Sequence, residues 1–222
     1  MKRKLVLILL LILPLSAYIY FSLAKHNSLF LPVITKNVNE LPAGSTFDGK
    51  PVTLKGNISI VGFLGDDITK KKETVFNINE KINNKYKGFN DFQIVMVMPE
   101  GEQEEVKKVM ADIKVMADIS NWKFLFVSPE QIAEFYNSLK TEKPLDADNG
   151  TYSLFIIDKE RSLRGRNGKD KKTGKHEFKD SYDSFQVSEM HNEMTDDIKI
   201  LLREYRLALK KNHGVKGVKR EI

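Results

Sequence analysis

The stretch that decides the fold is Ile58-Ser59-Ile60-Val61-Gly62-Phe63-Leu64. It is flanked by Gly56 and Gly65. A nearly continuous apolar run of this length, between turn residues, is typical of a strand whose two faces are both buried. Strands of this kind lie in the middle of a parallel sheet that helices cover on both sides. We therefore expect residues 58–64 to form a central strand of an α/β domain.

Apolar runs and helical spacing alternate along the rest of the chain. Strands are expected over residues 92–98, 122–127, 152–158 and 162–166, and helices over residues 69–87, 100–116, 128–139 and 188–211. An Asp48-Gly49 turn predicts a small hairpin over residues 46–54. Strands that alternate with helices predict a parallel sheet with helices on both faces. With its closing antiparallel pair and terminal helix, the chain resembles an α/β, thioredoxin-like domain.

The N-terminus differs from everything that follows it. The basic segment Lys2-Arg3-Lys4 precedes an uncharged, apolar run from Leu5 to Ala24. About 20 such residues can cross the ~30 Å hydrocarbon core of a membrane as a helix, and the basic flank keeps the N-terminus in the cytoplasm. We expect residues 1–24 to form one transmembrane anchor, with the rest on the extracytoplasmic, periplasmic side. The alternative is a signal peptide cleaved after Ser22-Leu23-Ala24, which would release the protein.

Charge divides the remainder of the chain. The 222 residues carry 36 Lys or Arg and 30 Asp or Glu, a formal net charge of +6. Basic residues gather at both ends and leave the body close to neutral, so nucleic-acid binding is not expected. We expect a spacer over residues 25–40, one folded domain over residues 41–211 and a disordered basic tail over residues 212–222.

The chain contains no cysteine. An exported protein without cysteine has no disulfide and depends on its core for stability. It also lacks a thiol nucleophile, a thiolate metal ligand and a redox couple. No Ser-His-Asp set, nucleotide-binding loop or zinc-ligand spacing is present either, so we expect neither catalytic residues nor a cofactor, and we identify no small-molecule substrate.

Over residues 41–209 the chain resembles the SCO/SenC family, membrane-tethered thioredoxin-like proteins that deliver copper during cytochrome oxidase assembly. The resemblance rests on Phe47-Asp48-Gly49-Lys50-Pro51-Val52-Thr53-Leu54, Ile58 to Phe63, Phe92-Gln93-Ile94-Val95, and Leu154 to Asp158 followed by Leu163-Arg164-Gly165. It implies a thioredoxin-like fold in the cell envelope and a partner among the respiratory complexes.

The copper ligands of the family are missing from this chain. The family places a C-x-x-x-C in the loop after the first core strand and a His shortly before the closing hairpin. Here residues 65–72 read Gly-Asp-Asp-Ile-Thr-Lys-Lys-Lys, and residues 145–150 read Leu-Asp-Ala-Asp-Asn-Gly. Because soft Cu(I) needs soft or borderline ligands, copper delivery cannot be carried over, and disulfide exchange is lost with the thiols.

The same two segments carry oxygen ligands instead. In the resembling fold Asp66 and Asp67 would face Asp146, Asp148 and Asn149, a hard-ligand set of the kind that binds Ca²⁺. The alternative is structural, since such residues also cap helices and form turns. A metal site at these residues is therefore one of two open hypotheses.

Two other groups of side chains are ambiguous. Met190, His191 and Met194 could bind copper, but both methionines fall on the apolar stripe of the last helix and suit a core equally well. Lys70-Lys71-Lys72 places cations at the start of a helix, where the dipole favours anions. It is either a solvated helix start or a contact for an acidic partner or lipid headgroups.

Together these features indicate a non-catalytic, membrane-anchored, SCO-like protein that holds or positions another envelope protein, with a role in respiratory-complex assembly. The alternative is an envelope protein that binds copper or calcium through an altered ligand set.

Overall fold

We describe a computed structural model, in which residues 10, 12–16, 18–19, 30–169 and 174–214 are described. Within those residues, no helix is both long enough and apolar enough to cross a membrane. Most of the expected anchor, residues 5–24, lies outside the described part of the chain, as do residues 215–222 of the expected tail.

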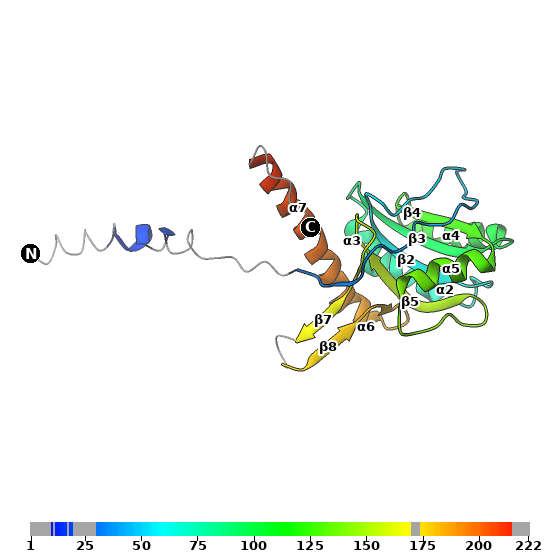
Figure 1. Ribbon diagram of the computed structural model, residues 1–222. Coiled ribbons are helices and arrows are strands. Elements are labelled where there is room, and N and C mark those ends of the chain that lie inside the picture. The colour runs from blue at the N-terminus through cyan, green and yellow to red at the C-terminus, as the bar shows by residue number, and fades with distance from the viewer. Residues whose placement is uncertain (1–9, 11, 17, 20–29, 170–173, 215–222) are drawn as a thin grey trace, which may run out of the picture.

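A seven-stranded sheet forms the centre of the domain (Figure 1). Its strands are β1 (Val33–Thr35), β2 (Ile58–Leu64), β3 (Phe92–Pro99), β4 (Trp122–Val127), β5 (Gly150–Ile157), β6 (Leu163–Arg164) and β9 (Tyr182–Asp183). The order is β1-β6-β5-β2-β3-β4, with β9 paired to β5. Strand β2 pairs in parallel with β3 and antiparallel with β5, and all of its residues are buried. The expected central strand is confirmed.

Helices cover both faces of this sheet. They are α2 (Lys72–Ile78), the π-helical η1 (Asn79–Asn83), α3 (Asn84–Tyr86), α4 (Gln103–Met116), α5 (Pro129–Leu139), α6 (Val187–Glu189), the π-helical η2 (Met190–Met194) and α7 (Thr195–Gly214). The apolar stripes of α2, α4 and α7 pack into one core, and α5 packs into a second core on the other face. The α/β, thioredoxin-like arrangement expected from the sequence is confirmed.

Local sequence explains where α5 begins. The Ser128 hydroxyl accepts a hydrogen bond from the Gln131 N–H, and the Gln131 side chain accepts one from the Ser128 N–H. Pro129 occupies the first turn, where a missing N–H costs nothing. This reciprocal pair is the capping box that the sequence predicts.

The domain begins earlier than expected. Residues 31–40 belong to the fold rather than to a spacer, because β1 pairs with β6 and both Leu31 and Val38 are buried. The spacer predicted over residues 25–40 is wrong in this part. A strand of three residues has too few positions to show a pattern, and its pairing depends on β6, which lies far away in the sequence.

Two further expectations are corrected. The Asp48-Gly49 turn forms, with Gly49 at φ +67°, but its flanks do not pair with each other. Ser45 bridges Phe126 of β4 instead, so the expected hairpin over residues 46–54 is absent. Between the strand expected to end at residue 166 and the helix expected from residue 188, no further element was predicted. The structure has a hairpin there, β7 (Arg166–Lys169) with β8 (His176–Lys179).

A buried arginine joins the two ends of the domain. Arg164 on β6 donates to Asp158 at 2.9 Å, to Glu204 of α7 at 2.5 Å, and through Nε to the carbonyl of Leu31 at 3.0 Å. Its side chain is 6% exposed, and that of Asp158 is 4% exposed. One guanidinium therefore ties the entering chain, the β5–β6 turn and the last helix together.

We expect Arg164→Met to lower the free energy of unfolding by about 3–5 kcal/mol, because it leaves the Asp158 and Glu204 carboxylates buried without a cation. Urea unfolding followed by circular dichroism measures the change. Exposed Arg203 provides the control, since Arg203→Met should stay within about 0.5 kcal/mol of wild type. Equal stability of the two variants would contradict the role assigned to Arg164.

Candidate functional site

Two loops meet at the end of the central strand, as the sequence predicts. In the β2–β5 pairing, Leu64 lies opposite Gly150 and Phe63 opposite Thr151. The segment that follows β2, residues 65–71, therefore lies against the segment that precedes β5, residues 145–149. These are the two segments in which the resemblance places the copper ligands of the SCO/SenC family.

Glycines allow the two loops to approach closely. Gly65 has φ +77°, and a Cβ atom at this position would lie 2.5 Å from Oδ2 of Asp148. A Cβ atom at Gly150 would overlap the ammonium group of Lys71. A side chain at either position would displace the Asp148 carboxylate or the Lys71 ammonium, and at Gly65 the positive φ favours glycine in addition.

A buried ion pair fills the space between the loops. The Nζ atom of Lys71 lies 2.8 Å from Oδ2 of Asp148, and the Lys71 side chain is 5% exposed. The other carboxylate oxygen accepts the Gly150 N–H at 2.9 Å. The Lys71 ammonium also lies 5.6 Å from the ring centre of Tyr152, within range of a cation–π contact.

Electrostatics around Asp148 favour its ionised form. Burial by itself raises the pKa of the carboxyl, but the Lys71 ammonium and the Gly150 N–H outweigh burial and hold the pKa below its ordinary value. A carboxylate in this state carries a full charge at neutral pH, and that charge is already neutralised by lysine.

The other candidate ligands serve the loops themselves. Asp67 accepts hydrogen bonds from the N–H and the hydroxyl of Thr69, and the Thr69 hydroxyl is the main cause of a lowered Asp67 pKa. Asp146 closes a turn through its backbone with Asn149 and Gly150, and Asn149 adopts φ +60°. Asp66 is exposed. Asp67, Asp146 and Asn149 thus have the turn roles that the structural alternative predicts. The predicted helix cap is wrong, because Lys71 is the N-cap of α2 and no side chain caps this helix.

No three His, Cys, Asp or Glu side chains come together to hold a metal ion anywhere in the described part of the chain. The hard-ligand set expected from the sequence thus does not assemble, because a lysine pairs with the one aspartate that reaches the β2 loop. Met190 and Met194 are fully buried in the core beneath the sheet, while His191 is exposed. These three residues therefore do not converge on a copper ion.

The three consecutive lysines now have an explanation that sequence reasoning missed. Lys70 lies 3.4 Å from Asp67, Lys71 pairs with Asp148, and Lys72 lies 3.1 Å from Asp112 of α4. The sequence indicated this position because three cations at the start of a helix oppose the helix dipole. It could not indicate their partners, because Asp148 and Asp112 lie far from the lysines in the sequence.

An exposed aromatic pair borders the ion pair. Tyr152 is 40% exposed and Phe185 is 61% exposed, and their ring centres lie 5.9 Å apart in a T-shaped arrangement. The N–H of Ser184 donates to the carbonyl of Tyr152 at 2.8 Å, which fixes the two rings relative to each other. We call Tyr152 and Phe185 the aromatic edge.

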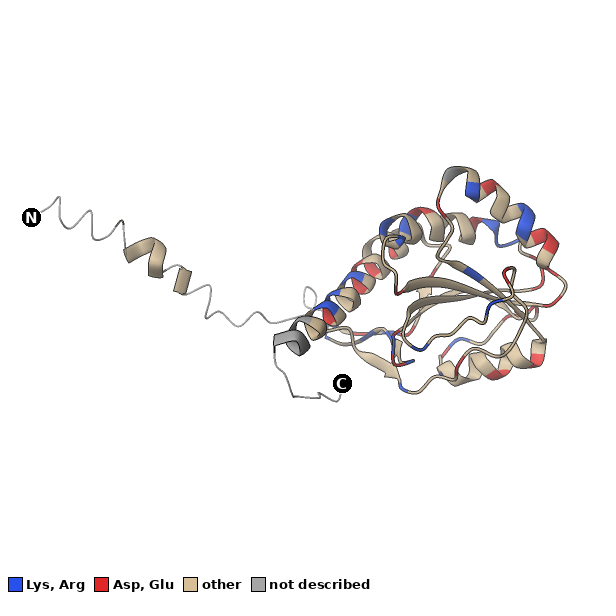
Figure 2. Ribbon diagram, turned by 90° about the horizontal axis from the view of Figure 1, so that it is seen from above, with Lys and Arg blue, Asp and Glu red and all other residues tan. Residues whose placement is uncertain are grey.

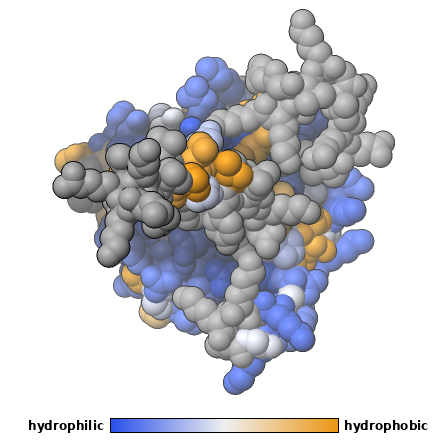
Figure 3. All heavy atoms as spheres, turned by 90° about the vertical axis from the view of Figure 1, so that its left-hand side faces the viewer, coloured by the Kyte–Doolittle hydropathy of each residue, from blue (hydrophilic) through white to orange (hydrophobic). Residues whose placement is uncertain are grey.

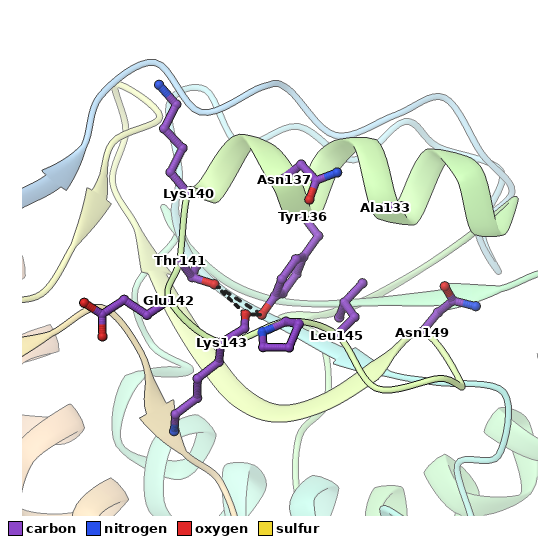
Figure 4. A pocket seen from close by; sticks show the side chains of 10 residues that line it. Ala133, Tyr136, Asn137, Lys140, Thr141, Glu142, Lys143, Leu145 and Asn149 are labelled. Carbon is purple, nitrogen blue, oxygen red and sulfur yellow. Dashed lines mark hydrogen bonds between the residues drawn. The ribbon is translucent and has the colours of Figure 1, made fainter.

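A pocket of about 400 Å³ lies beside the second loop, between α5 and residues 140–149 (Figure 4). Its polar groups bond to one another: the Tyr136 hydroxyl donates to the carbonyl of Lys143 at 2.7 Å, and the Thr141 hydroxyl donates to the same carbonyl at 2.9 Å. Burial raises the pKa of Tyr136.

We expect Lys71→Met to lower the free energy of unfolding by about 1–3 kcal/mol at neutral pH, because Asp148 then keeps its burial and loses its cation. Adding Asp148→Asn should recover part of that loss. Lys72→Met is the control, since its exposed pair should contribute no more than about 1 kcal/mol. Urea unfolding measures all three variants.

The same variant should change the response to acid. Since the folded pKa of Asp148 lies below its unfolded value of 3.8, its contribution is complete above that pH and is lost as the pH falls through the folded value. Lys71→Met should remove this part of the acid dependence. A stability of Lys71→Met equal to wild type at both neutral and acid pH would contradict the ion pair.

Metal addition separates the two hypotheses for the aspartates. We expect Ca²⁺ at about 1 mM to shift the melting temperature of the full chain by less than about 1 °C, since only a metal that binds the folded state raises it. A larger shift that Asp148→Asn removes would restore the metal site.

Comparison with known proteins adds the following. No protein-family model matches the sequence, and no curated protein matches it either. The structure is similar to BsSco, a member of the Sco family of cytochrome c oxidase assembly proteins, with 18% identity and a TM-score of 0.51 over 77% of this chain and 95% of that chain.

Two further solved structures show lower similarity. The soluble domain of Sco1 from Bacillus subtilis has 16% identity and a TM-score of 0.46 over 79% of this chain and 95% of that one. Copper-bound ScoI of Bradyrhizobium japonicum has 17% identity and a TM-score of 0.44 over 76% and 99%. At 18% identity the similarity to BsSco establishes the fold alone. The chain therefore has a Sco-like fold of the thioredoxin type, and its sequence contains no cysteine.

Proposed function

We propose that this protein is a non-catalytic, membrane-anchored member of the cell envelope that docks another protein and takes part in the assembly of respiratory complexes. The observation that carries the proposal is the Lys71–Asp148 ion pair. It occupies the position at which the resemblance places reactive ligands, and the aromatic edge lies next to it.

The ion pair supports a role without chemistry. A reactive centre needs a group that can accept a metal, a proton or a bond, and that group must reach the substrate. Lys71 is buried and paired, and Asp148 is held by two donors. The full sequence contains no thiol to take their place.

The aromatic edge supports docking. Tyrosine and phenylalanine are common among the residues that contribute most to protein–protein binding, since they bury a large area and lose few rotamers. Tyr152 and Phe185 are exposed next to each other, and the buried Lys71 ammonium contacts the Tyr152 ring from beneath. Side chains that are already held by neighbours lose less entropy when a partner covers them.

Residues 5–24 support the anchor, because their length and lack of charge suit a transmembrane helix. Cleavage after Ala24 would instead release a secreted or periplasmic protein. The respiratory role extends the description of BsSco as a member of a cytochrome c oxidase assembly family to this chain.

Site-specific photo-crosslinking in the native membrane tests the docking role. A photoreactive phenylalanine analogue at Phe185 should form adducts with an oxidase subunit or an assembly factor. The control carries the same analogue at Val115, an apolar residue of α4 that is 87% exposed. Adducts identical at the two positions, or none at Phe185 in repeated trials, would refute docking at the aromatic edge.

A further inference from the structure

The aromatic edge lies at the end of β2, where Phe63 pairs with Thr151. The chain enters at the β1 edge of the sheet, where Val33 lies opposite Arg164 and Arg164 lies opposite Ile156 of β5. There Arg164 also bonds Leu31 and Glu204.

Two elements project from the side where the chain enters. Figure 1 shows the β7–β8 hairpin and the C-terminal half of α7 extending past the body of the domain, on the side where Phe30 begins the described fold. Helices and sheet core lie on the other side of them. Together the hairpin and the end of α7 form two prongs on either side of the entering chain, and we call this the tether side.

Among the described residues, several exposed side chains on these prongs are basic. Lys169 and His176 are exposed on the hairpin, and Arg203 and Arg206 are exposed on α7, which continues into Lys210-Lys211.

Several of the acidic side chains among them are neutralised within the protein. Figure 2 shows both charge signs along α7, but Asp197 pairs with Arg166 at 2.7 Å and Glu204 pairs with Arg164 at 2.5 Å. On the hairpin, Glu177 lies 3.1 Å from Arg166. The exposed Asp196 at the start of α7 lines one pocket with Phe30 and Lys169, so this side also presents a carboxylate. Arg203 and Arg206 lie further along α7, toward its projecting end.

Exposed apolar side chains accompany these cations. Phe30 is 69% exposed, Phe178 of β8 is 43% exposed and Leu209 of α7 is 56% exposed. Figure 3 looks at this side and shows a hydrophilic surface with separate hydrophobic patches. Basic residues mixed with isolated apolar ones are typical of surfaces that rest on lipid headgroups, because the apolar groups enter the interface while the cations meet phosphate.

Chain length keeps this side near the membrane. If residues 5–24 span the bilayer, the chain from Ala24 to Phe30 reaches at most about 20 Å when fully extended. The tether side is thus held within a few Debye lengths of the lipid surface at all times.

We propose that the tether side lies on the anionic phospholipid headgroups of the membrane that holds the anchor. Lys169, Arg203 and Arg206 meet phosphate, and Phe178 and Leu209 enter the interface. The inference rests on the proposed membrane anchor, and the following experiment tests the two separately.

Because the chain contains no cysteine, one introduced cysteine is the only thiol and takes a single label. The full chain carries a fluorophore at Phe178→Cys, at Leu209→Cys, or at the control Glu130→Cys on the exposed first turn of α5. Each protein is reconstituted into phosphatidylcholine vesicles with or without about 30% phosphatidylglycerol, with a nitroxide on some headgroups.

With anionic lipid, quenching at Phe178→Cys and Leu209→Cys should be at least about twofold greater than at Glu130→Cys, and raising the salt to about 1 M should reduce it. Adding Lys169→Glu and Arg206→Glu should have the same effect as salt. Quenching that is equal at all three positions, or indifferent to anionic lipid, overturns the inference. The inference is also overturned if an added acidic protein shields the labels on the hairpin and on α7, while the nitroxide lipid never quenches them.

Flotation of the same vesicles reports on the anchor alone. A chain that floats with both lipid compositions but shows no position-dependent quenching keeps its anchor and refutes only the orientation. A chain that fails to float refutes the anchor, and the lipid-facing orientation with it.

Discussion

The ammonium group of Lys71 lies at the end of the central strand β2, between the loop that follows β2 and the loop that precedes β5. Without this group, the carboxylate of Asp148 and the loop backbone would surround an open space. Lys71 and Asp148 close this space at 2.8 Å, and the glycines at positions 65 and 150 leave no room for another atom. Removing the charge of either partner would leave the other charge buried and uncompensated, which would destabilise the fold. The geometry of both loops, and the position of Tyr152 above them, follows from this contact.

The remaining polar interactions divide the domain into two ends with different chemistry. Near the end of β2, Lys71 and Asp148 neutralise each other and aromatic surface is exposed. Near the chain entry, Arg164 and Arg166 neutralise Glu204, Asp197 and Glu177, while Lys169, Arg203 and Arg206 are exposed. Buried ion pairs thus do more than hold elements together, because they also decide which charges remain at the surface.

Most of the sheet and the helices could be predicted from sequence because their patterns are local. The apolar run over residues 58–64, the stripes of α4, α5 and α7, and the capping box at Ser128 are each encoded within a few turns or one strand. Elements that depend on a distant partner were missed. β1 exists through β6, and the bridge of Ser45 to Phe126 replaced the expected hairpin. The candidate site follows the same rule: the meeting of the two loops was predictable, but the lysine between them was not.

The sequence by itself determined the succession of strands and helices along the chain and the loss of thiol chemistry, since periodicity and composition carry that information without any knowledge of contacts. The family resemblance implied which two segments meet at the end of β2. Only the tertiary structure decided which charges pair. Asp148 could have faced Asp66 and Asp67 around a cation, and instead it faces the ammonium of Lys71, 77 residues away along the chain. Ion pairing depends on distance and on shielding from water, and both are properties of the folded chain.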